Sequence, residues 1–208
     1  PQHPQDASVA LQNVHFSYDG KTEIIKGVSL EIQPGQTGFD ATLGYGGHTK
    51  AMLACLEGRG HIYATDVDPE ESAKTKKRLL EQGYGEEILT IKLQNFCTID
   101  EIAKEAGGFD FVLADLGVSS MQIDNPERGF SFKVEGPLDL RLNQKEGISA
   151  AERLDTITKE ELAGMLYENS DEPYSEELAK AITDEIRRGN RMDTTKKLRD
   201  VIEKTLMF

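Results

Sequence analysis

Cysteine, basic residues and long apolar runs are all scarce in this 208-residue sequence. It contains two cysteines, and 24 basic residues stand against 37 acidic ones, for a formal net charge of −13. Cys55 and Cys97 lie in apolar helix and strand-end contexts, so we expect buried free thiols and no disulfide. The negative charge argues against non-specific affinity for nucleic acids, because binding to phosphates needs a basic surface. Any RNA-directed function must therefore explain this charge.

No apolar stretch is long enough to cross a bilayer, and the polar residues 1–8 do not resemble a signal peptide. We therefore expect no membrane partner and a cytoplasmic location. A chain of this length can bury one good hydrophobic core, with a small lobe attached to it.

A glycine-rich turn, DATLGYGGH at residues 40–48, is the most informative feature of the chain. It follows a short apolar run and precedes a predicted helix, which is how α/β proteins seat nucleotide-type cofactors. Glycines let backbone N–H groups approach a ligand closely, and a helix N-terminus favours a carboxylate or phosphate. The next predicted strand ends in Asp66, about 20 residues on, where an acid usually holds a ribose hydroxyl. The spacing predicts a cofactor site.

Three of the polar residues also have plain structural interpretations when each is taken alone. Asp40 could satisfy the backbone of the glycine turn, Asp66 could cap the following helix, and His48 could be a polar residue at a helix start. Their joint spacing favours the cofactor site over these alternatives.

Strand-like and helix-like segments alternate through the middle of the chain, which predicts right-handed crossovers and a parallel sheet with the ligand at the carboxyl ends of its strands. An N-terminal hairpin precedes this part, and only helices are expected after residue 121. The predicted strands are 9–16, 24–32, 39–43, 61–65, 88–93 and 109–114, and the predicted helices are 50–57, 70–82, 99–105, 149–154, 158–168, 175–188 and 194–207.

Several longer motifs together carry a resemblance to a known family. They are DATLGYGGH at 40–48, DVDP at 66–69, NF at 95–96, DLGVSS at 115–120, ERGFSF at 127–132 and GPLDLR at 136–141. On these motifs, residues 38–208 resemble the bacterial 16S rRNA cytosine-N4 methyltransferases of the MraW type, which use S-adenosylmethionine (SAM). The resemblance implies an α/β fold: a partial Rossmann-like SAM methyltransferase sheet, with the N-terminal β-hairpin and an inserted helical lobe.

The resemblance also implies which residues bind the cofactor. Gly46, Gly47 and His48 would hold the methionine part of SAM, Asp66 its ribose hydroxyls and Phe96 its adenine. Asp115 and Gln122 would complete the site. These roles fit the chemistry, since an aromatic ring stacks on a base and a carboxylate accepts hydroxyl donors.

The methyl group of SAM is already electrophilic, so the reaction needs no metal and no covalent nucleophile, only an amine aligned with the methyl. Cytosine N4 is a poor nucleophile, and an acceptor for its amino protons would help. Asp115 and the polar Ser119 and Ser120 are placed for this role. DNA amino-methyltransferases usually carry an Asp/Asn-Pro-Pro-aromatic loop here, whereas this chain has DLGV, so Asp115 fits a SAM ligand better than a catalytic base. The target would be a flipped, single-stranded cytosine of ribosomal RNA or the small subunit.

The first 37 residues do not resemble the usual start of that family. Residues 9–37, with FSYDG at 16–20 and GVSLEIQPGQT at 27–37, look like the first hairpin of an ATP-binding cassette ATPase. The GxxxxGK[ST] phosphate loop is missing, because no hydroxyl residue follows Lys50. Tyr18 would correspond to the adenine-stacking tyrosine of those ATPases, although a plain hairpin aromatic is the simpler interpretation. The sequence thus resembles a chimera with domains at 1–37, 38–120 and 121–208.

The MraW family completes its sheet with further strands after the helical lobe, whereas this sequence stops at Phe208 after a helix. We therefore expect SAM binding but little methyl transfer, and an open edge beside the strand at 109–114. The hairpin or a second copy of the chain, as a homodimer, could cover this edge. A non-catalytic SAM-binding or interaction module and an ATP-binding cassette fragment are the alternative functions.

Basic residues of the helical part leave two interpretations open. Arg128, Lys133, Arg141 and Arg153 could contact RNA, or they could be solvated or paired with acids within the protein.

Overall fold

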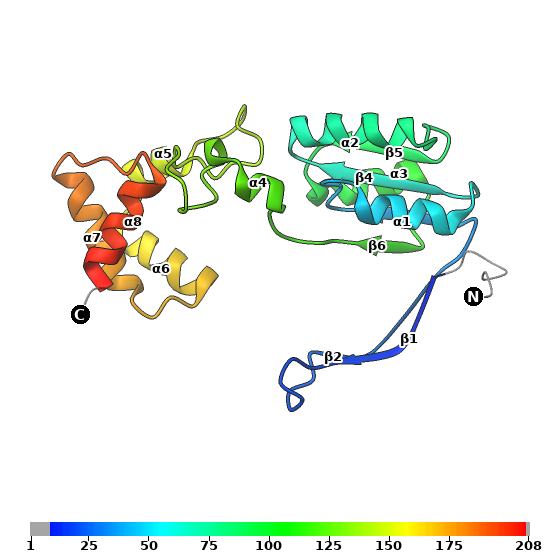
Figure 1. The fold of residues 1–208 in the computed structure, drawn as a ribbon, viewed down its shortest axis with the longest axis horizontal. Helices are drawn as coiled ribbons and strands as arrows, with labels where there is room; N and C mark the ends of the chain where they lie inside the picture. The colour runs from blue at the N-terminus through cyan, green and yellow to red at the C-terminus, as the bar shows by residue number, and fades with distance from the viewer. Residues whose placement is uncertain (1–8, 207–208) are drawn as a thin grey trace. The chain divides into compact units, whose positions relative to one another are not determined.

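A computed structural model describes residues 9–206 of the chain. The fold divides into two compact units, which meet in the sequence at Gly117 and Val118. The first contains the hairpin and the parallel sheet, and the second is helical (Figure 1). The finer division into domains 1–37, 38–120 and 121–208 stays a prediction.

A four-stranded parallel sheet forms the centre of the first unit, which confirms the predicted α/β fold class. Its strands lie in the order β5-β4-β3-β6, so the chain turns back past β3 when it forms β6. The alternation of strands and helices follows the sequence prediction closely. The elements are β3 (Thr37–Asp40), α1 (Gly47–Leu56), β4 (His61–Asp66), α2 (Pro69–Glu81), β5 (Leu89–Leu93), η1 (Phe96–Thr98), α3 (Ile99–Ala106) and β6 (Phe111–Leu113).

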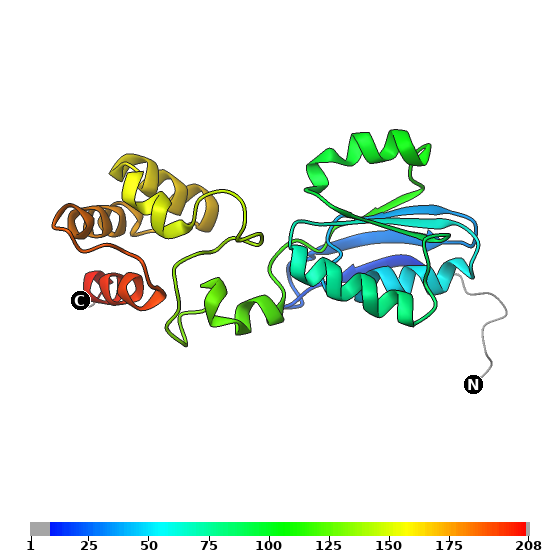
Figure 2. The ribbon, with the colours of Figure 1, turned by 90° about the horizontal axis from the view of Figure 1, so that it is seen from above.

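Helices cover both faces of this sheet. Figure 2 shows α1 and α2 on one face and α3 on the other. Leu53 and Leu56 of α1 pack with Ile62 of β4 in the larger core. Phe39 of β3 and Ile102 of α3 pack in the smaller core on the opposite face. Burial on both faces explains why apolar residues of these strands face both layers of helices.

The N-terminal hairpin is present, as predicted. β1 (Val9–Phe16) pairs antiparallel with β2 (Ile25–Ile32), and irregular register interrupts the ladder between Leu11 and His15. Ile32, at the end of β2, is buried in the larger core of the first unit. The hairpin is a separate two-stranded sheet. The hairpin was one of the two possible covers for the edge of β6, and among the described residues it does not cover this edge, because its strands pair only with each other.

The edge of β6 stays open in the part of the chain that the structure describes, residues 9–206. β6 pairs there with β3 alone, and Val112 in its middle is exposed. The prediction of an open edge is confirmed for these residues.

The second unit is built from helices around its own core. Leu162 of α6 and Ala179 and Ile182 of α7 are buried there with Leu138 from the preceding loop. The elements are α4 (Ser120–Asp124), η2 (Pro126–Arg128), α5 (Ala150–Thr156), α6 (Lys159–Ser170), α7 (Ser175–Arg187) and α8 (Thr195–Leu206). Among the described residues, no helix is long and apolar enough to cross a membrane.

Two expectations need correction. Cys55 is buried and free as predicted, but the free Cys97 is exposed, because it lies in the 3₁₀ helix η1, which buries none of its residues. The sequence analysis also missed η1, α4 and η2. Each spans only three to five residues, too few to show a helical period in the apolar pattern.

Candidate cofactor site

The predicted site residues of the first unit gather at the carboxyl edge of the sheet. Asp66 ends β4, the glycine turn follows β3, Asp115 follows β6, and Phe96 lies three positions after the end of β5. Since all pairs in this sheet are parallel, the carboxyl ends of its strands lie at one edge, and this arrangement brings these residues together. The reversal of strand order at β3 is where open α/β sheets bind their ligands.

The glycine turn leads directly into α1 and leaves that helix end open. Gly46 is the N-cap residue, with φ of +78° and no side-chain cap. Its own N–H donates to the carbonyl oxygen of Leu43 at 2.7 Å. Gly47 and His48 follow in the first turn of the helix. Their N–H groups have no carbonyl acceptor within the helix, because the first N–H groups of any helix lack one. A Cβ added at Gly47 would meet no atom within 4 Å, so this helix end can receive an anionic group.

Asp40 has a structural role: it satisfies the backbone of the glycine turn, which was one of its two interpretations from the sequence. Its side chain is fully buried. One carboxylate oxygen accepts from the N–H of Thr42 at 3.0 Å and the other from the hydroxyl of Thr49 at 2.6 Å. Asp40 therefore shapes the glycine turn from inside the protein and does not face a ligand.

Asp66 ends β4, Phe96 begins η1 just after the neighbouring strand β5, and both side chains remain accessible. The two Asp66 oxygens accept from the N–H groups of Gly44 at 2.7 Å and Asp68 at 2.9 Å. A carboxylate offers about four lone-pair positions, so Asp66 can still accept two hydroxyl donors. Phe96 is 43% exposed, and the end of β5 is paired with Asp66 in the sheet register. An accessible acid and an open aromatic ring at the ends of neighbouring strands suit a ribose and its base. The N-cap role that we considered for Asp66 belongs to Asp68.

Asp115 and His48 meet across the point where the strand order reverses. His48 Nδ1 lies 3.8 Å from Asp115 Oδ2, and both side chains are exposed. The N–H of Asp115 donates to the hydroxyl of Thr42 at 2.9 Å, which ties the end of β6 to the glycine turn. Thr42 is thus a part of the site that the sequence analysis missed, since only the fold brings residues 42 and 115 together.

Gln122 belongs to the second unit. It is buried in α4, where its Oε1 accepts from the N–H of Ser119 at 2.9 Å and the Ser119 hydroxyl accepts from the N–H of Gln122 at 3.2 Å. This capping box gives Gln122 a structural role within its own unit. Its contribution to the cofactor site stays a prediction.

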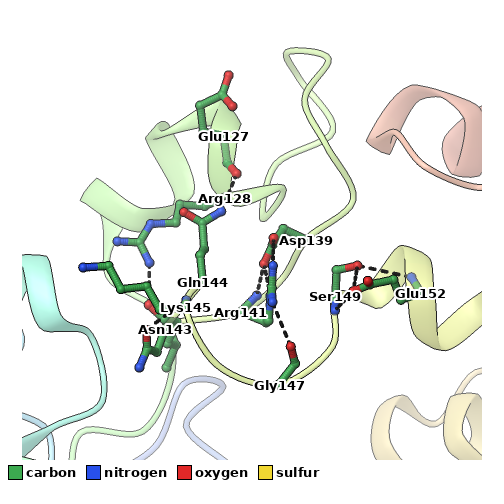
Figure 3. Close-up of polar contacts among 11 residues, drawn as sticks. Glu127, Arg128, Asp139, Arg141, Asn143, Gln144, Lys145, Gly147, Ser149 and Glu152 are labelled. Carbon is green, nitrogen blue, oxygen red and sulfur yellow. Dashed lines mark hydrogen bonds and ion pairs between the residues drawn. The ribbon is translucent and has the colours of Figure 1, made fainter.

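The arginines considered for RNA contact are engaged within the second unit, and Figure 3 shows the contacts of Arg128 and Arg141. Arg141 donates to both oxygens of Asp139, at 2.9 and 2.7 Å, and to the carbonyl oxygen of Gly147 at 2.9 Å. Arg128 is buried and donates to the carbonyl oxygen of Leu142 at 2.5 Å. Arg153 pairs with Glu161. The interpretation of these three as internally paired residues is therefore confirmed.

The Arg141–Asp139 pair also has an electrostatic effect. Hydrogen bonds from Arg141 are the main cause that lowers the pKa of Asp139 below its ordinary value, against the opposing effect of burial. The same contact raises the pKa of Arg141. The pair holds a tight loop in which Leu140 has φ of +64°, a conformation that is rare for a bulky residue.

The residues present at the carboxyl edge fit SAM. The open helix end suits its carboxylate, Asp66 suits its ribose hydroxyls and Phe96 suits its adenine. Within residues 9–206, no cluster of three or more His, Cys, Asp or Glu side chains is arranged to hold a metal ion. This donor set and this strand order define an α/β protein with the Rossmann-like methyltransferase fold.

Comparison with known proteins shows the family to which this chain belongs. The profile of the MraW methylase family matches residues 21–208. The chain is 82% identical to ribosomal RNA small subunit methyltransferase H 1 of Agathobacter rectalis over 179 residues, which is 86% of this chain and 51% of that protein. It is 70% identical to the protein of the same description from Lachnoclostridium phytofermentans, over 86% of this chain and 49% of that protein. The chain therefore belongs to the MraW methylase family, whose members depend on SAM.

The chain spans about half the length of the curated relatives it matches. Among solved structures, a protein-L-isoaspartate O-methyltransferase superposes with a TM-score of 0.36 and 13% identity, over 51% of this chain and 32% of that chain. The family match begins at residue 21, inside the segment 9–37 that resembles an ATP-binding cassette ATPase. These comparisons give no support to that second resemblance.

Proposed function

We propose that this chain binds SAM at the carboxyl edge of its sheet and belongs to an enzyme that methylates cytosine N4 in 16S ribosomal RNA. The observation that carries the proposal is the convergence of the open N-terminus of α1 with Asp66, Phe96 and Asp115 at one edge. The identities of 82% and 70% to ribosomal RNA small subunit methyltransferases support the substrate class.

Each group at this edge has a chemical role in the proposal. The N–H groups of Gly47 and His48 bind the carboxylate of SAM, Asp66 accepts its ribose hydroxyls and Phe96 stacks on its adenine. When bound, SAM supplies an electrophilic methyl group. Asp115 is exposed beside His48, where it is a ligand of SAM and also accepts a hydrogen bond from the cytosine amino group, which orients the nitrogen lone pair toward the methyl. Gln122 remains a cofactor residue predicted from the sequence resemblance alone.

The partners follow from the same proposal. The substrate is ribosomal RNA or the small ribosomal subunit, in the cytoplasm, and a second copy of the chain can cover the open edge of β6. The origin of residues 9–37 in an ATP-binding cassette ATPase remains a prediction from sequence.

Calorimetric titration with SAM and S-adenosylhomocysteine tests the cofactor site directly. Asp66→Ala should weaken binding of both by about 1–3 kcal/mol, the usual scale for hydrogen bonds to a charged group. The matched control is Asp100→Ala, which removes an exposed acid that pairs with Lys104 on α3. We expect this control to bind like the wild type. Equal affinity in Asp66→Ala and the wild type would remove Asp66 from the site, and no binding by the wild type would refute the proposed function.

A further inference from the structure

Two side chains of α2, those of Thr75 and Arg78, contact the backbone of the glycine turn. The hydroxyl of Thr75 donates to the carbonyl oxygen of Gly44 at 2.7 Å. Arg78 Nη2 donates to the carbonyl oxygen of Tyr45 at 2.7 Å and to the hydroxyl of Thr75 at 2.7 Å. Because residues three apart share one face of a helix, both donors reach two consecutive carbonyl groups of the turn.

The same two side chains also pack against the turn. The Arg78 guanidinium lies over the ring of Tyr45, with its carbon 3.6 Å from the ring centroid. A Cβ added at Gly46 would lie 2.7 Å from the Thr75 methyl, so that methyl fills the space directly under the N-cap of α1. Thr75 is fully buried. Hydrogen bonds and packing from one helix thus act on three successive residues of the turn.

A turn of this composition needs such support. Residues 44–47 read Gly-Tyr-Gly-Gly, and glycine has more backbone freedom to lose than any other residue. Gly44 and Gly46 both have positive φ, +47° and +78°. The N–H of Gly44 also donates to Asp66 at 2.7 Å, so the shape of the turn fixes Asp66 relative to the open end of α1.

We propose that Thr75 and Arg78 are positioning residues that hold the glycine turn in the shape that receives SAM. This inference rests on the proposed SAM site and assigns two residues that do not themselves touch the cofactor. Without them the turn would populate other conformations, and the fraction of molecules competent to bind would fall, which lowers the apparent affinity by the same factor.

The decisive variants are Thr75→Val, which keeps the shape but removes the hydroxyl, and Thr75→Ser, which keeps the hydroxyl. Thr75→Val should weaken S-adenosylhomocysteine binding roughly 3- to 10-fold, the factor that corresponds to one lost hydrogen bond. Thr75→Ser should retain most of the affinity. Arg78→Met should also weaken binding, while Lys76→Met removes a positive charge from the same helix, where Lys76 pairs with Glu86, and should not.

Hydrogen exchange of the unliganded variants separates positioning from general destabilisation. In Thr75→Val and Arg78→Met, the amides of residues 44–48 should exchange faster, while those of β4 exchange as in the wild type. Should Thr75→Val fail to fold, the surface-facing Arg78→Met with its Lys76→Met control carries the test.

The outcomes distinguish this inference from the proposed function. If the wild type does not bind S-adenosylhomocysteine, both are wrong. If the wild type binds but Thr75→Val and Arg78→Met bind equally well, the SAM site stands and the positioning role is refuted. A loss of affinity in Thr75→Ser without one in Thr75→Val would also refute it, because the hydroxyl would then be irrelevant.

Discussion

The two neighbouring glycines of the turn, Gly46 and Gly47, should respond in opposite ways to the same substitution. Gly46 has φ of +78°, and an added Cβ would lie 2.7 Å from the Thr75 methyl and 3.2 Å from Leu79 Cδ1. Gly47 has open space around the added atom and is the first residue of α1. Substitution of Gly46 therefore tests packing, and the same substitution of Gly47 tests ligand binding.

Gly46→Ala should destabilise the first unit. A left-handed backbone costs a residue with a Cβ about 1–2 kcal/mol, and forcing a methyl into a filled space typically costs about 1–3 kcal/mol. We expect the free energy of unfolding to fall by roughly 2–5 kcal/mol, the sum of these two effects. Urea denaturation followed by far-ultraviolet circular dichroism measures it.

Gly47→Ala should leave stability unchanged or slightly higher, because alanine favours the helix over glycine. It should nevertheless weaken SAM binding, because a methyl group beside the open N–H groups obstructs close approach of the carboxylate. Calorimetric titration of the folded variant measures this loss. A stable Gly46→Ala protein would refute the packing argument, and undiminished SAM affinity in Gly47→Ala would refute the close approach at the helix end.

Two further predictions concern the Arg141–Asp139 pair and Asp115. Because the pKa of Asp139 is lowered in the folded protein, the pair stabilises the fold fully above about pH 4, the ordinary carboxyl pKa, and this stabilisation is lost as the pH falls through the lowered pKa. Asp139→Asn should therefore lower the free energy of unfolding by roughly 1–3 kcal/mol at pH 7 and by progressively less as the pH falls below about 4. Urea denaturation of both proteins at pH 7 and in acid checks this, and a difference that does not change with pH would contradict it. Methyl transfer from tritiated SAM to small ribosomal subunits should be weak, since the net charge of −13 opposes approach to RNA at low salt, and it should fall further in Asp115→Ala. Robust incorporation that does not depend on Asp115 would remove that residue from the reaction.

The order and type of the main elements follow from the sequence. Apolar segments of strand length alternate with helical segments between residues 38 and 116, and this local pattern is enough to give a parallel sheet with its ligand edge. The glycine turn and Asp66 could be located because their roles depend on backbone conformation and on spacing along the chain. Short elements such as α4 (Ser120–Asp124) could not be predicted. A helix of about one turn is stabilised by caps such as Ser119 and is too short to show a helical period in its apolar residues.

The direction in which each polar side chain points was decided only by tertiary structure. Asp40 and Asp66 both end strands of the same sheet, yet Asp40 is buried against Thr42 and Thr49, whereas Asp66 stays accessible. Their local sequences do not distinguish them, since burial depends on which helix packs over each strand end. The contacts of Thr75 and Arg78 with the glycine turn likewise join residues about 30 positions apart. Only the packing of α2 against the glycine turn brings them within hydrogen-bonding distance, so no motif in the sequence marks them.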